Sequence, residues 1–356
     1  MERSPDPPAA PRFMLKPRRA ISAVPEEMVS FNLTGDRFLP AIARPSASAI
    51  DLIAWAESDR ERIQATLLRH GAILFRGFDV GCPAEFEKFI TAVSGRPLPY
   101  IERSSPRTSV SGHIYTSTEY PAEQSIFLHC ENSYQRTWPL KIFFYCETPA
   151  EQGGETPIAD TRRVLQRISP AVREKFARKD VMYVRNFGNG LGLPWQTVFQ
   201  THDKHTVERY CANAGIECIW DGDRLQTRRV GEAIQIHPVT GESVWFNHAV
   251  FFHVSTLDPT TKRVLQASLS ELDLPNNTYY GDGSRIEDEA LDQLRAAYHD
   301  ETVRFSWSHG DVLMLDNMLA AHGRSPYRGA RRILVGMAEP YTGPGNAKPK
   351  TGAEDK

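Results

Sequence analysis

The chain has 356 residues, with 42 basic and 44 acidic side chains and a formal net charge of −2. This balance lacks the basic surplus that binding to nucleic acid or to an anionic membrane requires. Hydrophobic residues make up 40% of the chain and charged residues 24%, which is typical of a globular protein. A chain of this length can bury a stable core without disulfides or structural metals.

The cysteines and the N-terminus bear on the compartment. There are 5 cysteines and no C-x-x-C pair, which argues against a disulfide framework or a structural zinc site. No apolar run reaches the ~18 residues that a membrane-spanning helix needs. Residues 1–13 carry prolines and charges where a signal peptide needs an apolar stretch. We therefore expect reduced thiols and a cytoplasmic protein with no membrane or nucleic-acid partner.

The first third of the chain reads as an arm followed by helices. Residues 1–25 are rich in proline, arginine and alanine without periodicity, and we predict a mobile arm. Apolar side chains recur at helical spacing over residues 51–70, and Gly71 supplies a C-terminal stop. A short apolar run at 72–75 predicts a strand, and a proline opens a predicted helix at 83–93.

From residue 126 onward, short strand-like runs bounded by turn residues dominate the pattern. These runs are residues 126–128, 141–145, 181–184, 243–246, 303–305, 312–315 and 332–335. Two helical segments, 164–178 and 288–298, interrupt them, and residues 343–356 read as a flexible tail. Many short strands with flanking helices predict a mostly β fold of the sandwich or jelly-roll kind.

Pairs of histidine and acid at i and i+2 are candidate metal ligands, because alternate side chains of a strand point the same way. With 11 histidines and 44 acidic residues, roughly one or two such pairs arise by chance, so a pair alone is weak evidence. The chain has three: His129/Glu131, His299/Glu301 and His309/Asp311. The second pair follows a helical segment and the third reads as a turn, so we expect surface or turn roles there. Only His129 follows a strand-like run with a long chain still to come.

His322 is the best third ligand. It follows the strand-like run 312–315 and its exit, and ten residues later Arg332 opens another apolar run. Two imidazoles and one carboxylate leave open positions on an iron(II) ion for a co-substrate and O₂. A guanidinium brought back beside the metal would pair the carboxylate of a dicarboxylate co-substrate.

With these residues in order, the sequence resembles the TauD/TfdA family of iron(II)- and 2-oxoglutarate-dependent dioxygenases, and within it the SyrP-like branch. The segments that carry the resemblance are residues 71–78, 114–121, 128–134, 153–160, 244–247, 279–283 and 310–324. The resemblance implies one dioxygenase domain over residues 26–342, with a double-stranded β-helix (jelly-roll, clavaminate synthase-like) core. It also implies that Fe(II) is the cofactor and that 2-oxoglutarate and O₂ are co-substrates.

The resemblance assigns roles to individual residues. His129, Glu131 and His322 match the family's iron ligands, and Arg332 and Thr156 match the residues that hold the far carboxylate of 2-oxoglutarate. Halogenases of this type lack the carboxylate ligand, so Glu131 favours an oxygenase. Sulfonate-oxidising relatives carry a second arginine four residues after the co-substrate arginine. Gly336 stands there, which argues against a sulfonate substrate.

The branch implies hydroxylation of an unactivated C–H bond in an amino acid or amino-acid-derived unit, free or tethered to a carrier protein, in natural-product biosynthesis. Desaturation or cyclisation at the same iron site is an open alternative. A jelly-roll protein that binds a metal or a small acid without turnover is another. The candidate substrate-contacting residues are Tyr115, Thr116, Ser117, Asn247, His248 and Arg324.

Overall fold

The computed structural model describes residues 28–35, 37–47, 50–100, 107–118, 120–188 and 190–344. The predicted arm, residues 1–25, and all but two residues of the predicted tail, 343–356, lie outside these ranges. The assignment of residues 26–342 to a single domain stays a prediction.

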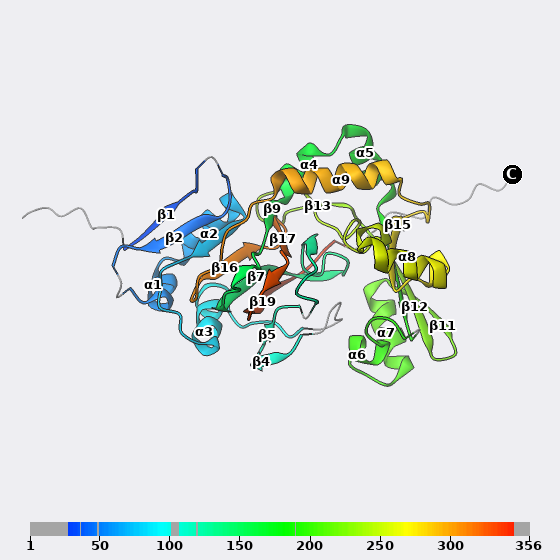
Figure 1. Ribbon diagram of the computed structural model, residues 1–356, viewed down its shortest axis with the longest axis horizontal. Coiled ribbons are helices and arrows are strands. Elements are labelled where there is room, and N and C mark those ends of the chain that lie inside the picture. The colour runs from blue at the N-terminus through cyan, green and yellow to red at the C-terminus, as the bar shows by residue number, and fades with distance from the viewer. Residues whose placement is uncertain are drawn as a thin grey trace, which may run out of the picture.

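An eight-stranded sheet is the largest element of the fold (Figure 1), with strand order β1-β2-β3-β16-β7-β19-β5-β4. Its neighbours pair antiparallel except for β2 and β3, which are parallel. The strands are β1 (Val29–Asn32), β2 (Ala41–Pro45), β3 (Ala72–Phe75), β4 (Ser109–Ser111), β5 (Ile114–Thr116), β7 (Thr137–Thr148), β16 (Val312–Asp316) and β19 (Arg332–Thr342).

A three-stranded sheet in the order β6-β17-β9 packs against the large one. Its strands are β6 (Ile126–His129), β9 (Ile158–Asp160) and β17 (Ala320–Arg324). Alternation along the strands builds the core between the sheets. Phe144 of β7 and Leu313 of β16 share one apolar cluster with Ile158 of β9, while their neighbours Phe143 and Met314 belong to a cluster on the opposite face. The predicted mostly β architecture of the jelly-roll kind is thus what the chain adopts.

Helices cover both outer faces, and prolines and caps decide where they break. On the large sheet lie α1 (Leu52–Ser58), α2 (Arg60–His70) and α3 (Pro83–Ser94), so the helix predicted over 51–70 is two helices that meet at Asp59. Beyond the small sheet lie α4 (Thr161–Arg167), α5 (Pro170–Lys179) and α9 (Asp288–Glu301). The helix predicted over 164–178 divides before Pro170, because proline disfavours a helical conformation in the residue that precedes it.

A four-stranded sheet, β11-β12-β10-β15, stands apart from the sandwich on the right of Figure 1. Its elements are β10 (Val181–Phe187), α6 (Trp195–Phe199), α7 (Lys204–Ala214), β11 (Glu217–Asp221), β12 (Arg224–Gly231) and β15 (Asn276–Tyr280). The remaining elements are β8 (Gln152–Gly153), β13 (Ile234–Ile236), β14 (Ser243–Trp245), η1 (Val254–Thr256), α8 (Pro259–Ser268), η2 (Glu271–Asp273) and β18 (Tyr327–Arg328). The strand predicted at 303–305 is wrong: Val303 forms only an isolated bridge with Ile158.

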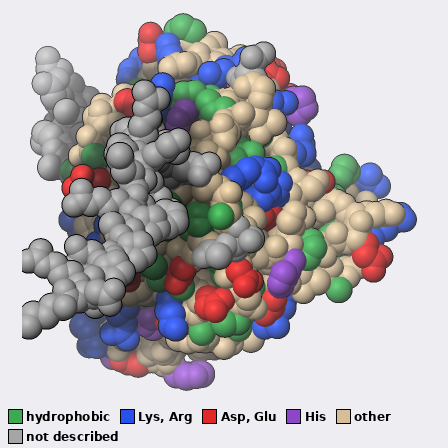
Figure 2. Space-filling model, turned by 90° about the vertical axis from the view of Figure 1, so that its left-hand side faces the viewer, with side chains coloured by type: hydrophobic (Ala, Val, Ile, Leu, Met, Phe, Trp, Pro, Cys, Tyr) green, Lys and Arg blue, Asp and Glu red, His purple; other side chains and the backbone are tan. Residues whose placement is uncertain are grey.

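Basic and acidic side chains are interspersed on the face that Figure 2 shows. Within the described part of the chain, no helix has both the length and the apolar character to cross a bilayer.

A buried charge network joins the strands beneath the small sheet. Asp316 at the end of β16 pairs in register with Lys141 of β7, and its Oδ2 lies 2.7 Å from the lysine Nζ and 3.2 Å from His237 Nε2. The other carboxylate oxygen accepts the backbone N–H groups of Met318 and Leu319. Burial alone would raise the pKa of Asp316, but Lys141 and His237 outweigh it and hold the pKa at about 2. The charge therefore fixes the turn that leads from β16 into β17.

Removing this charge should destabilise the fold. Asp316→Asn leaves the Lys141 ammonium buried without its counter-charge, so we expect unfolding free energy to fall by about 3–5 kcal/mol. Chemical denaturation of the full chain measures this. The control is Asp292→Asn, which removes an exposed pair with Arg295 and should cost less than about 0.5 kcal/mol. Equal effects of the two substitutions would contradict the assigned role.

Candidate metal centre

Three side chains that could hold a metal converge at the small sheet. β6 ends at His129, and the antiparallel register sets His322 of β17 directly opposite it. Glu131 lies in the turn after β6, not on the strand as the i, i+2 argument assumed. One ligand atom of each residue lies within 4.8 Å of the other two. The structure therefore brings the predicted ligands together, with Glu131 positioned by a turn.

Asn317 holds that turn in place. Its Oδ1 accepts the backbone N–H of Glu131 at 2.7 Å, and its amide nitrogen donates to the carbonyl oxygens of Glu131 at 2.9 Å and Pro139 at 2.8 Å. Asn317 is fully buried and directly follows Asp316. The amide thus fixes the backbone of the carboxylate ligand from both sides.

The two imidazoles are held neutral, which metal binding requires. Burial lowers the pKa of His129 and lowers that of His322 well below its ordinary value. The Nδ1–H of His129 donates to the carbonyl oxygen of Phe127 at 2.9 Å, which leaves Nε2 as the free lone pair. The ring of Phe251 stacks on that imidazole with centroids 4.2 Å apart and fixes its plane.

This donor set fits iron(II). Two neutral imidazoles and one carboxylate on one face are the ligand set of non-haem iron oxygenases and leave positions open for other ligands. Glu131 is only 2% exposed, and Arg107 donates to its Oε2 at 2.8 Å, which fixes the position of the carboxylate. In the described part of the chain, the only cluster of three histidine, cysteine or acidic side chains with metal-binding geometry is this one.

A small cavity opens beside the candidate ligands. Its lining residues are Arg107, Ser117, Thr118, Ile126, His129, Phe144, Thr156, His322, Gly323, Arg324, Arg331 and Ile333. Thr156, predicted to hold the co-substrate, lies in this lining with its hydroxyl accepting the indole N–H of Trp307 at 3.2 Å. The cavity thus combines one hydroxyl-bearing wall with several guanidinium groups.

Arg332, the predicted co-substrate arginine, is not part of this lining. Its side chain is 50% exposed and pairs with Glu147 at 2.8 Å, on the outside of the sheet. Side chains alternate regularly from Arg331 into β19. Arg331 and Ile333 therefore face the cavity, and Arg332 between them faces the other side.

Arg331 is the arginine that lines the cavity, where Arg332 was expected. Its Nε donates to the carbonyl oxygen of Gly154 at 2.9 Å, and burial lowers its pKa to about 10. Gly154 has φ +71°, and a Cβ there would lie 3.0 Å from the arginine side chain and 2.9 Å from Ala150. The glycine of the Gly153–Gly154 pair is therefore needed both for the backbone turn and for the close approach of Arg331.

The position four residues beyond the arginine carries no second cation. A Cβ on Gly336 would lie 2.4 Å from the side chain of Ile90 on α3, so this residue faces the helix layer and not the cavity. Counted from Arg331, the fourth residue is Val335, which is fully buried in the apolar core between the sheets. With either arginine, no guanidinium stands where the sulfonate-oxidising relatives carry one.

Of the three polar candidates on β5 and its exit, one lines the cavity. Ser117 does so. Tyr115 instead packs in the core between the sheets, and its hydroxyl accepts the backbone N–H of Tyr100 at 3.1 Å. The hydroxyl of Thr116 accepts the backbone N–H of Thr108 at 2.9 Å. These two residues hold the edge of the sheet, and neither lines the cavity.

Asn247 and His248 follow β14, which ends at Trp245. The amide of Asn247 donates to Ala233 O at 2.7 Å and accepts from Ala249 N at 2.9 Å, so it braces the loop. His248 lies outside the cavity lining, but its ring contacts His129 with centroids 5.7 Å apart. Its Nδ1 lies 2.5 Å from the hydroxyl oxygen of Ser133, and burial lowers its pKa well below the ordinary value.

Arg324 lines the cavity, but its guanidinium is committed to the backbone. It donates to the carbonyl oxygens of Tyr120, Pro121 and Gln124. The side chain therefore secures the loop before β6, and its aliphatic stem contributes to the wall.

Three residues that the sequence reasoning left out stand next to the candidate metal site: Arg107, Asn317 and Arg331. Arg331 differs from the predicted residue by one position, and the alternation of side chains decides which of the two faces the cavity. Asn317 belongs to the quoted segment 310–324, so its place after a strand was visible but its contact with Glu131 was not. Arg107 had no signal of its own, because no periodic segment or motif contains it.

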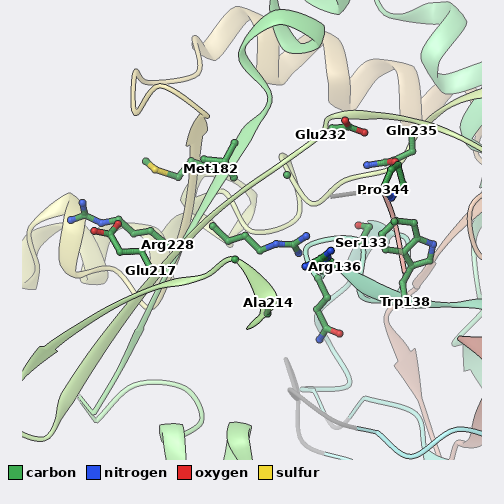
Figure 3. A pocket seen from close by; sticks show the side chains of 16 residues that line it. Ser133, Arg136, Trp138, Met182, Ala214, Glu217, Arg228, Glu232, Gln235 and Pro344 are labelled. Carbon is green, nitrogen blue, oxygen red and sulfur yellow. The ribbon is translucent and has the colours of Figure 1, made fainter. Parts of the chain in front are cut away.

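A second, larger cavity of about 830 Å³ lies on the other side of the Ser133–His248 contact. Ser133, Arg136 and Trp138 line it from the β6–β7 turn and β7, and Arg228 and Met182 line it from the four-stranded sheet (Figure 3). The cavity therefore separates the sandwich from that sheet, and only the serine links it to the candidate metal site.

Asn317→Ala should weaken metal binding. Without the amide, the Glu131 turn loses two hydrogen bonds, and we expect Fe(II) affinity to fall about 10–100-fold, as for other groups that support metal ligands. Anaerobic Fe(II) titration measures this. Asn186→Ala is the matched control, because Asn186 also donates to two carbonyl oxygens but lies on β10. Unchanged affinity in Asn317→Ala would show that Glu131 is held by other contacts.

Comparisons with known proteins agree with the fold. The profile of the family described as "Taurine catabolism dioxygenase TauD, TfdA family" matches residues 37–338. The chain is 39% identical to the dapdiamide synthesis protein DdaC of Enterobacter agglomerans over 302 residues, which cover 85% of this chain and 92% of that one. It is 29% identical to a clavaminate synthase-like protein of Arabidopsis thaliana over 319 residues, covering 84% and 93%.

Among solved structures, PvcB of Pseudomonas aeruginosa has a similar fold, with a TM-score of 0.54 at 14% identity. The alignment covers 89% of this chain and 93% of that chain. The sequence prediction of a jelly-roll dioxygenase fold is confirmed. The chain belongs to the TauD/TfdA family and is an iron(II)- and 2-oxoglutarate-dependent oxygenase, with O₂ as its second co-substrate.

Proposed function

We propose that the enzyme hydroxylates an unactivated C–H bond of an amino acid or an amino-acid-derived compound in natural-product biosynthesis. His129, Glu131 and His322 hold the iron in this proposal. The observation that carries it is the convergence of these three ligand atoms within 4.8 Å, in a buried site where both imidazoles are neutral. A complete carboxylate-bearing ligand set favours transfer of oxygen over transfer of halide.

The residues around the ligands have distinct tasks. Thr156 and Arg331 hold the far carboxylate of 2-oxoglutarate, because both line the cavity and offer a hydroxyl and a guanidinium. Phe144, whose ring lies 5.0 Å from that of His322, and the apolar Ile126 and Ile333 exclude water from the reacting end. When bound, the iron and 2-oxoglutarate supply the oxidising power, with release of succinate and CO₂.

The substrate class rests on the relatives and on the absence of a sulfonate clamp. The relative with 39% identity is named for dapdiamide synthesis, which supports a biosynthetic role for this chain. Gly336 and Val335 face apolar layers, so the position that clamps a sulfonate in relatives offers no charge here. A screen of free and carrier-bound amino acids tests in which form the substrate is bound.

Glu131→Ala and His322→Ala should abolish turnover. We expect succinate release with Fe(II), 2-oxoglutarate and O₂ to fall at least about 100-fold, beyond the range for residues that only support a ligand. A second measurement, mass spectrometry of the products from free and carrier-bound amino acids, identifies the reaction. A product that has gained one oxygen indicates hydroxylation, and a product that has lost two hydrogens indicates desaturation. His299→Ala, at an exposed histidine of α9, is the control. Wild-type rates in Glu131→Ala would refute the metal assignment.

Substitutions of Arg331 and of Arg332 should change the KM for 2-oxoglutarate to different extents. Arg331→Met removes a charge-assisted contact worth about 1.5–3 kcal/mol, so the KM for 2-oxoglutarate should rise ~10-fold or more. Arg332→Met removes a half-exposed ion pair and should change this KM less than about twofold. The opposite pattern would return the co-substrate to Arg332.

A further inference from the structure

Arg107 is a buried cation whose hydrogen-bonding capacity is only partly used. Its side chain is 4% exposed, and its Nη2 donates to Glu131 Oε2 at 2.8 Å. Its Nε and Nη1 are buried and find no hydrogen-bond partner in the described ranges of the chain. An arginine has five N–H donors in a planar fork, so at least one edge of this fork remains open.

An open guanidinium edge in a buried site calls for an anion. Leaving buried donors unpaired costs free energy, and a planar carboxylate is the group that matches the fork. Of the other two arginines in the cavity lining, Arg324 donates to three backbone carbonyl oxygens, whereas Arg331 donates its Nε to Gly154 and is assigned to 2-oxoglutarate in the proposed function. Arg107 is the one of the three that contacts a candidate metal ligand.

The place of Arg107 points its charge at the reacting end of the cavity. The ring of Tyr100 lies 4.6 Å from the guanidinium carbon and fixes the plane of the fork. Arg107 lines the same cavity as His129 and His322, and Ser117 and Thr118 line it as well. The guanidinium therefore lies beside the candidate metal ligands.

We propose that Arg107 binds a carboxylate of the organic substrate beside the metal, while its Nη2 continues to orient Glu131. This inference rests on the proposed function and adds one requirement to it: the substrate presents a free carboxylate close to the carbon that is oxidised. A substrate whose carboxyl groups are all masked as amides or thioesters would leave the buried fork unpaired and bind weakly.

The carboxylate could belong to the substrate or to 2-oxoglutarate, and the structure favours the substrate. Thr156 and Arg331 already provide for the far carboxylate of the co-substrate, and its keto-acid end is the part that binds the metal. Arg107 reaches the site from the Glu131 side, through a different loop from the one that carries Arg331.

The test uses the full chain loaded anaerobically with Fe(II) and 2-oxoglutarate, followed by the visible absorption band of that complex. Propionate and its neutral match propionamide are titrated into wild type, Arg107→Gln and Arg107→Lys. The control is Arg285→Gln, an exposed arginine paired with Glu271. Arg107→Lys keeps a positive charge beside Glu131, so it serves if Arg107→Gln does not fold.

We expect propionate to perturb the band of wild type and of Arg285→Gln saturably, and propionamide to bind ~10-fold more weakly or not at all. Arg107→Gln should lose at least about 10-fold in propionate affinity, and Arg107→Lys should fall between, with the 2-oxoglutarate affinity of both within about threefold of wild type.

Three results would overturn the inference: equal responses to propionate and propionamide, unchanged propionate affinity in both Arg107 variants, or weakened 2-oxoglutarate loading with propionate binding unchanged. The last result would assign the carboxylate to 2-oxoglutarate. Failure of wild type to load Fe(II) and 2-oxoglutarate would instead remove the proposed function itself, and that outcome is seen before any propionate is added.

Discussion

The antiparallel pairing of β6 with β17 is the constraint on which the site depends. It sets His322 opposite His129, although these residues lie far apart in the sequence, and no local interaction could do so. A slip of one residue would turn every side chain of β17 to the opposite face and remove one ligand. Two buried contacts at the end of β16 stabilise this register. Asp316 pairs with Lys141 of β7, and the next residue, Asn317, hydrogen-bonds to the backbone of Glu131.

The second constraint is the free-energy cost of burying charged side chains, which requires each of them to have a partner. Asp316 and Lys141 neutralise each other, so they contribute structure and no reactivity. The candidate metal site holds a second such pair, because Glu131 faces Arg107 at 2.8 Å. The difference is that Nε and Nη1 of this guanidinium are buried without a hydrogen-bond partner in the described ranges of the chain. The fully satisfied pair contributes rigidity, and the partly satisfied one leaves donors for an anion.

Residue types and their order could be predicted from the sequence, whereas side-chain orientation and helix ends could not. The convergence of His129, Glu131 and His322 could be predicted because these residues stand in a recognisable order around strand-like runs. Arg331 could not be separated from Arg332, because the sequence does not show which of two adjacent side chains faces the cavity. The helix breaks at Asp59 and before Pro170 were missed because the apolar spacing continues across both breaks. Asn247 was expected to contact the substrate, whereas its amide braces the loop after β14.

Two arginines from different parts of the chain, Arg331 and Arg107, line the cavity. Arg331 comes from the segment that enters β19, and the glycine pair at 153–154 allows its close approach. Arg107 comes from the segment before β4 and contacts the candidate metal ligand Glu131. In our proposals the first arginine holds the co-substrate and the second holds the substrate, so different parts of the fold bind the two carboxylates. A buried guanidinium on the substrate side would select for an acid over a neutral compound, because only an anion matches its open donors.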